Sequence, residues 1–223
     1  MNEVHEPDSR PGREERRERI MKSAATVFAS KGFESSTITD IIQAAGVARR
    51  TFYNYFESKK EVFLKLVEAY FDGYTTVLGR GYDNLVLVLE RDPSGTIDAW
   101  RELVLSILEF HNENRELTVL VWREAQAEDE HFTARVQELI RMARERVVEE
   151  FRLMADKGLL VDLDVELATT IINSAVMTIV LDHVLRKDDL DLRAIADQLV
   201  RYQARALAPD RSVVDQAFGS QVY

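Results

Sequence analysis

Apolar residues recur at helical spacing along most of this chain, and the alternation typical of β-strands is rare. In the segment from about Arg13 to Lys31, apolar residues at i, i+4, i+7 and i+8 from Ile20 form a single stripe. Such a stripe predicts an amphipathic helix that buries one face. Gly32 follows it and is expected to end the helix as a left-handed cap.

Two short helices are expected after Gly32. Thr37 is predicted to cap the first of them, with Asp40 three residues later as the acidic partner of a capping box. Gly46 would end that helix because glycine tolerates the positive φ of a tight turn. The second short helix would cover about Ala48 to Tyr55, and Ser58 would cap a long fourth helix.

Proline breaks and apolar periodicity divide the rest of the chain into further helices. They are expected at about 96–112, 116–125, 130–157, 165–186 and 192–207. Gly73, Gly79 and Gly81 leave open whether the fourth helix frays, kinks or continues toward Glu90. The pattern predicts an all-α protein of about nine helices. It is expected to comprise a flexible arm (1–12), a head (13–60), a body (61–208) and a tail (209–223).

The charge is distributed unevenly along the chain. The net charge is −10, yet the segment from Arg10 to Lys60 holds 11 Lys/Arg against 6 Asp/Glu. Cysteine is absent, which excludes disulfides and thiolate chemistry. The polar N-terminus lacks the apolar core of a signal peptide, and no run of about 18 apolar residues is evident. We therefore expect a cytoplasmic protein that does not span a membrane.

The two short helices around Gly46 have the features of a helix-turn-helix unit. Ala45 is small enough for a close helix crossing, and Ile41, Val47 and Phe52 would form the shared core. The opposite face of the second short helix would then be free to enter a DNA major groove. Singly, each of these features is more typical of an ordinary helical hairpin or a solvated surface. Their combination in the locally basic segment favours DNA binding.

The stretch "FASKGFESSTITDIIQAAGVARRTFYNYFESKKEVF", residues 28–63, resembles the DNA-binding domain of TetR-family transcriptional regulators. Ala48 replaces a frequent Ser cap, Ile42 stands where Ala is frequent, and Tyr55 occupies a position that is often His. The resemblance implies a homodimer whose head binds an operator and whose body binds a small molecule. The residues expected to contact DNA are Thr37, Thr39, Ala48, Arg49, Arg50, Thr51, Tyr53, Asn54, Tyr55 and Lys59.

The helix expected at 165–186 is apolar on nearly all sides. Because such a helix must be covered all round, a partner subunit is a natural cover for it and for the helix that follows. The competing interpretation is that both helices belong to the core of a monomer. The residues expected at a dimer interface are Ile172, Val176, Ile179, Val180, His183, Ile195, Leu199 and Tyr202.

A ligand pocket is expected in the body, lined by apolar and aromatic side chains with few polar ones. For most of these residues ordinary core packing is the competing interpretation. The candidates are Phe71, Tyr74, Trp100, Leu103, Ile107, Phe110, His111, Trp122, Glu124, Met142, Met154, Asn173 and Met177. The identity of the ligand does not follow from them.

Motifs for enzymatic chemistry are not evident in the sequence. The four histidines have no metal-binding spacing, and neither a glycine-rich phosphate loop nor a GxSxG motif occurs. We expect neither a cofactor nor an enzyme. The expected partners are a double-stranded operator with an inverted repeat, a small-molecule effector that releases a repressor, and a second copy of the chain. Two alternatives remain open: a helical protein-interaction module with a vestigial head, and a hydrolase that uses body carboxylates.

Overall fold

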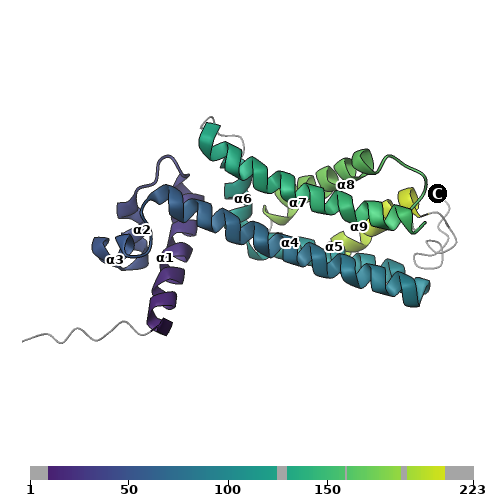
Figure 1. The fold of residues 1–223 in the computed structure, drawn as a ribbon, viewed down its shortest axis with the longest axis horizontal. Helices are drawn as coiled ribbons and strands as arrows, with labels where there is room; N and C mark the ends of the chain where they lie inside the picture. The colour runs from purple at the N-terminus through teal and green to yellow at the C-terminus, as the bar shows by residue number, and fades with distance from the viewer. Residues whose placement is uncertain (1–9, 125–129, 159, 187–189, 209–223) are drawn as a thin grey trace, which may run out of the picture. The chain divides into compact units, whose positions relative to one another are not determined.

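The computed structural model describes residues 10–124, 130–158, 160–186 and 190–208, and these ranges are almost entirely helical and contain no strand (Figure 1). The all-α prediction is confirmed. The helices are α1 (Arg10–Lys31), α2 (Ile38–Ala45), α3 (Arg49–Tyr53), α4 (Lys59–Arg91), the 3₁₀ turn η1 (Pro93–Gly95), α5 (Thr96–Glu113), α6 (Arg115–Glu124), α7 (Glu130–Asp156), α8 (Val165–Ile179), the π-helical turn η2 (Val180–Val184) and α9 (Leu192–Leu207). The expected arm and tail lie largely or wholly outside the described residues.

The chain divides into two compact units. The first, here called the head, comprises Met1–Ala69 and Glu116–Asp129; the second, the body, comprises Tyr70–Arg115 and Glu130–Tyr223. Sequence analysis drew the boundary at residue 60 and assigned the segment that forms α6 to the body. The structure groups α6 with the head, where the Arg123 guanidinium donates to the Phe28 carbonyl oxygen at 2.9 Å.

The head is built around the predicted apolar stripe of α1. Ile20, Ala24 and Phe28 on this helix are completely buried. The ring of Phe28 lies 5.6 Å from the rings of Phe33 and Phe63, centroid to centroid. These aromatic contacts join α1 to the loop after it and to the start of α4. They supply a rigid base for the two short helices.

Helix α4 continues through its glycines to Arg91, so the open question about its end is resolved in favour of an unbroken helix. The glycines have a packing role. A Cβ built at Gly81 would lie 2.3 Å from Leu103 Cδ1, and one at Gly73 would lie 3.0 Å from Phe110 Cε2. Leu103 and Phe110 belong to α5. The missing side chains therefore let α5 pack closely against α4.

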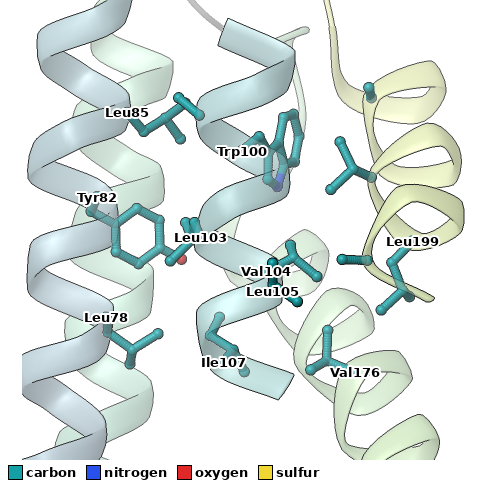
Figure 2. Close-up of a cluster of buried hydrophobic side chains, with 14 of the residues drawn as sticks. Leu78, Tyr82, Leu85, Trp100, Leu103, Val104, Leu105, Ile107, Val176 and Leu199 are labelled. Carbon is teal, nitrogen blue, oxygen red and sulfur yellow. The ribbon is translucent and has the colours of Figure 1, made fainter. Parts of the chain in front are cut away.

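The core of the body is formed by side chains from α4, α5, α7, α8 and α9. Figure 2 shows Tyr82 of α4 directed toward α5, while Val176 of α8 approaches α5 from the other side. The Arg101 guanidinium on α5 donates to the Asp197 carboxylate on α9 at 2.9 Å. These contacts hold α4, α5, α8 and α9 around one apolar interior.

One part of the body departs from the expectation that no segment is apolar enough to span a membrane. The helical segment Val165–His183 is long and apolar enough to cross a membrane, and only 17% of it is buried. A single such helix is weak evidence for membrane insertion, because helices of protein cores and interfaces have the same composition. Leu167 and Ile171 are 58% and 56% exposed, so this helix has an uncovered apolar face.

Candidate nucleic-acid interface and internal cavity

The start of α2 is fixed by the predicted capping box. The Thr37 hydroxyl accepts from the Asp40 backbone N–H at 3.2 Å, and the Thr37 backbone N–H donates to the Asp40 carboxylate at 2.9 Å. Lys31 Nζ also donates to Asp40 at 2.5 Å, and this bond with the Thr37 bonds lowers the pKa of Asp40 to about 2. The carboxylate therefore stays ionised at neutral pH. The Thr37 hydroxyl, which was expected to contact DNA, is hydrogen-bonded to Asp40 in the cap.

The turn between α2 and α3 has the geometry that the sequence predicts. Gly46 has a φ of 62° and a ψ of 38°, in the left-handed region that favours glycine. Ile41, Phe52 and Phe56 are buried, with Phe52 and Phe56 ring centroids 5.9 Å apart. The turn and this core fix the direction in which α3 presents its other face.

Helix α3 is shorter than expected, ending at Tyr53 with Asn54 as its C-cap. Ala48 precedes it with an extended backbone and makes no capping hydrogen bond, because the alanine side chain has no polar atom. Arg49, Arg50 and Tyr53 are exposed. Neither guanidinium group has an ion-pair or hydrogen-bond partner in the part of the chain that the structure describes. The helix therefore offers two uncommitted guanidinium groups beside a phenol.

The other residues assigned to DNA differ in their surroundings. Thr39 and Asn54 are exposed, Thr51 is half-buried, and the Tyr55 ring lies under the Arg13 guanidinium with 5.9 Å between carbon and centroid. Lys59 is directed inward. Its ammonium donates to the carbonyl oxygens of Phe33 at 2.6 Å and Ser36 at 2.8 Å, and more weakly to that of Glu34. A phosphate role for Lys59 stays a prediction, and in this structure its ammonium holds the loop before α2.

The body contains a small cavity of about 30 Å³ lined by residues from α4, α5, α7, α8 and α9. Six of the ligand candidates lie on its wall: Tyr74, Trp100, Leu103, Ile107, Met154 and Asn173. Burial raises the pKa of the Tyr74 phenol to about 12, so this hydroxyl stays protonated. Among the described residues, the cavity wall carries no charged side chain. This arrangement suits an apolar molecule with few polar groups.

The remaining ligand candidates do not line this cavity. Phe110 packs against the ring of Tyr74, Met177 packs against the body core, and Phe71 lies against Tyr70. Met142 is 51% exposed on α7, and its role in a pocket stays a prediction. Trp122 lies on α6 and belongs to the head unit. The side chain of Glu124 lies outside the described residues. Periodicity identified these residues as apolar or helical but does not say which helix face meets which neighbour.

His111 is buried in an aromatic cluster next to the cavity. Its Nδ1 lies 3.0 Å from the Tyr70 hydroxyl, and its ring stacks near Tyr74 with 5.2 Å between centroids. Burial lowers the pKa of His111 to about 4, so the imidazole is neutral at pH 7. It acts as a hydrogen-bonding member of the core at that pH.

Gln203 is a buried polar residue of the body that was not predicted from the sequence. Its side chain is 4% exposed, lines the cavity and has no hydrogen-bond partner for either amide atom among the described residues. A signal was available, since Gln203 lies on the apolar face of α9 between Val200 and Leu207. A polar residue on such a face is a candidate for a buried site.

An open groove of about 520 Å³ crosses the exposed faces of η2 and α9. It contains five of the residues expected at a dimer interface: Ile179, His183, Ile195, Leu199 and Tyr202. Val176 and Val180 are instead buried in the core, and Ile172 lines the cavity. These three face the interior of the body in this structure, and their assignment to the interface stays a prediction. Leu190, Ala194 and Gln198 complete the groove and were not predicted.

Metal chemistry finds no support in the described ranges. Within them, no three His, Cys, Asp or Glu side chains are close enough together to hold an ion. Several carboxylates occupy surface ion pairs, such as that of Glu102 with Arg193 at 2.8 Å.

Comparison with known proteins gives similarity of two kinds. Residues 20–66 match the family model described as "Bacterial regulatory proteins, tetR family". The HTH-type transcriptional regulator EthR of Mycolicibacterium smegmatis is 30% identical over 103 residues, which is 46% of each chain. The matched region spans about half the length of the curated relatives.

Two solved structures share the fold over most of the chain. The TetR-family regulator PfmR of Thermus thermophilus has a TM-score of 0.68 at 19% identity, covering 84% of this chain and 98% of its own. FadR of Bacillus subtilis in complex with stearoyl-CoA has a TM-score of 0.66 at 18% identity, covering 83% and 96%. At these identities the similarity establishes the arrangement of helices and leaves the ligand open.

Proposed function

We propose that this chain, which belongs to the tetR family of bacterial regulatory proteins, is a homodimeric DNA-binding transcriptional regulator. More specifically, it is a repressor that a small, mainly apolar ligand releases from a palindromic operator. We infer a cytoplasmic protein without enzymatic activity, in keeping with relatives named as transcriptional regulators.

The surface of α3 carries this proposal. Arg49 and Arg50 are exposed and uncommitted within the described residues, while Phe52 anchors the opposite face of the helix in the core. An arginine can donate two hydrogen bonds to the O6 and N7 atoms of guanine, and the Tyr53 hydroxyl suits a phosphate or a base edge. A free basic face on a firmly anchored short helix is what major-groove reading requires.

The dimer is supported by the groove across η2 and α9 and by the adjoining apolar face of α8. Tyr202 is 73% exposed, and Leu167 and Ile171 are more than half exposed. Exposed apolar surface of this kind marks an interaction site. A second copy of the chain fits it best, because a two-fold dimer presents two α3 helices to the two halves of a palindrome.

Ligand release is supported by the cavity in the body and by the stearoyl-CoA complex of the similarly folded Bacillus subtilis regulator. By linkage, a ligand that releases DNA must bind the DNA-free form more tightly than the DNA-bound form. The coupling between the two sites can therefore be measured as the effect of the ligand on DNA affinity or as the effect of DNA on ligand affinity.

The test is selection of bound fragments from random duplex DNA with the purified full chain at about 150 mM salt. Recovery of an inverted repeat is the expected result and supports both DNA reading and the symmetric dimer. Recovery of nothing above background contradicts binding by the free protein. It would favour a head that no longer reads DNA and a body that binds another protein.

A further inference from the structure

The cavity of the body has polar groups on an otherwise apolar wall. Its polar side chains are the phenols of Tyr74 and Tyr82 and the amides of Asn173 and Gln203. All of them are uncharged, and no Lys, Arg, His, Asp or Glu of the part of the chain that the structure describes contributes to the wall. Figure 2 shows the α4 and α5 part of this region, with Tyr82 and Leu103 side by side.

Gln203 is the feature that points to a ligand. The amide is 4% exposed, and both its oxygen and its nitrogen lack a hydrogen-bond partner within the described residues. A buried amide with neither atom paired is destabilising, and native proteins pair the great majority of such groups. The amide oxygen can accept a hydrogen bond and the amide nitrogen can donate one. A ligand that pairs with both atoms therefore needs a donor and an acceptor next to each other.

We propose that the ligand of this cavity is a neutral, mainly apolar molecule whose polar end carries a donor and an acceptor side by side, as a primary carboxamide or a lactam does. The ligand carbonyl accepts from Gln203 Nε2 while its N–H donates to Oε1, which forms a paired amide–amide contact. This inference rests on the proposed function, since it assigns the chemical class of the effector.

The charge of the wall excludes the ionised alternatives. A carboxylate or an ammonium in this cavity would be desolvated without an opposite charge. The Tyr74 phenol stays protonated because burial raises its pKa to about 12, so it also remains a neutral donor. A site built to pair with both a donor and an acceptor strongly rejects analogues that lack one of them.

The cavity is smaller than the ligand that we propose for it. At about 30 Å³ it has room for one or two water molecules, whereas ligand pockets are usually about 300–1,000 Å³. Entry of a ligand therefore requires its wall to move. Met154 is suited to this because its unbranched thioether side chain changes rotamer easily.

The experiment compares three probes of equal chain length by isothermal calorimetry on the full chain in the absence of DNA. The probes are octanamide, N,N-dimethyloctanamide, which lacks the donor, and octanoate, which carries a charge. We expect octanamide to bind at least about tenfold more tightly than either of the others. Absence of octanamide binding, or equal or tighter binding of octanoate or the dimethyl amide, overturns the proposal.

Two variants at Gln203 and a matched control locate the effect. Gln203→Leu is expected to unfold at a higher temperature than the parent, because it removes two unpaired buried groups, and to lose the preference for octanamide. Gln203→Met gives the same test with an unbranched side chain if the leucine variant does not fold. Gln137→Leu, at an exposed glutamine of α7, is expected to change neither property. A lower unfolding temperature for both Gln203 variants would mean that the amide is satisfied internally, and the proposal would fail.

Failure of the proposed function is distinguishable from failure of this inference. The calorimetry involves no DNA, so a preference for octanamide stands even if no operator is recovered. Conversely, recovery of an inverted repeat with no preference among the three probes leaves the regulator in place and removes only the ligand class.

Discussion

Lys59 Nζ donates to the carbonyl oxygen of Phe33 at 2.6 Å and lies over the ring of the same residue, 4.3 Å from its centroid. The same ammonium also reaches the Ser36 carbonyl oxygen at 2.8 Å. One side chain at the start of α4 thus holds the loop that leads into α2. The loop in turn carries Thr37, the cap of the first helix of the helix-turn-helix unit.

Replacing Lys59 by Met keeps the aliphatic stem and removes the ammonium. The loop carbonyls then lose their donor, so we expect the free energy of unfolding to fall by about 1–2 kcal/mol. The salt dependence of DNA binding should stay that of the parent. Urea unfolding and DNA binding at several salt concentrations measure the two effects. Lys65→Met, which breaks only an exposed pair with Glu68, is the control.

The opposite outcome for Lys59→Met is equally informative. Parent-like stability together with a salt slope that is less steep by about one charge would assign Lys59 to a DNA phosphate. The hydrogen bonds from Lys59 to the loop carbonyls would then contribute little to stability.

Arg49→Ala is expected to weaken binding to the selected operator by about 1–3 kcal/mol and to affect random DNA much less. The reason is that an exposed, uncommitted guanidinium on α3 is placed for a base edge. Fluorescence anisotropy with operator and scrambled duplexes measures both affinities. Arg80→Ala, at an exposed position of α4, controls for the general loss of one positive charge. Equal losses on both duplexes would mean that Arg49 contacts only the backbone of DNA.

Local chemistry made much of the head predictable. Thr37, Asp40 and Gly46 each have a conformational preference that depends only on near neighbours, and each behaves as the sequence predicts. The hydrogen bonds of Lys59 were not predictable in this way, because its partners lie more than 20 residues earlier in the chain. The sequence suggested a DNA phosphate as its partner, and the loop that accepts its hydrogen bonds comes close only when the chain folds.

The contact between Gly81 and Leu103 predicts opposite effects at two neighbouring glycines of α4. A methyl group at Gly81 meets Leu103 Cδ1 at 2.3 Å, so we expect Gly81→Ala to lower the free energy of unfolding by about 1–3 kcal/mol. A methyl group at Gly79 meets no other side chain or helix within 4 Å among the described residues, and Gly79→Ala should raise stability by about 0.5–1 kcal/mol. Thermal unfolding of the two variants and the parent measures both changes in stability. Stabilisation by both substitutions would show that α5 does not pack at the described distance.

His111 predicts a pH dependence of stability. The folded protein holds the pKa of His111 at about 4, below the 6.5 of the unfolded chain, so protonation favours unfolding. The stabilising contribution is fully present above pH 6.5 and is lost as the pH falls from about 6.5 to 4, by about 3 kcal/mol at most. Urea unfolding between pH 4 and 8 measures this loss. We expect His111→Gln, which still accepts from Tyr70, to flatten the curve, and an unchanged curve would assign the dependence to other groups.

Tyr202→Glu is expected to break the dimer. The substitution places a charge in the apolar groove, and two-fold symmetry repeats it in both subunits. A loss of about 2 kcal/mol or more would raise the dissociation constant at least about 30-fold. Sedimentation velocity over a concentration series measures it. Leu153→Glu, at an exposed position of α7, is the control, and a monomeric parent would refute the dimer outright.

The interface and the cavity were only partly predictable, for a physical reason. An apolar helix such as α8 gives no periodic signal that separates the side facing its own core from the side facing a partner. Val176 and Val180 therefore appeared equivalent to Ile179, although the first two are buried and the third lines the groove. The π-helical turn η2 adds to this ambiguity, because its extra residue shifts the register of the helix.

The two-sided character of α8 has a practical consequence for engineering. Leu167 and Ile171 lie on its exposed side, whereas Ile172, Asn173 and Val176 line the cavity. Under the proposed function, substitutions of the first two are expected to change which copies associate, and substitutions of the other three to change which compound binds. The two sets share no residue. We therefore expect that substitutions in this one helix of 15 residues can change the association of copies without changing the ligand, or change the ligand without changing the association.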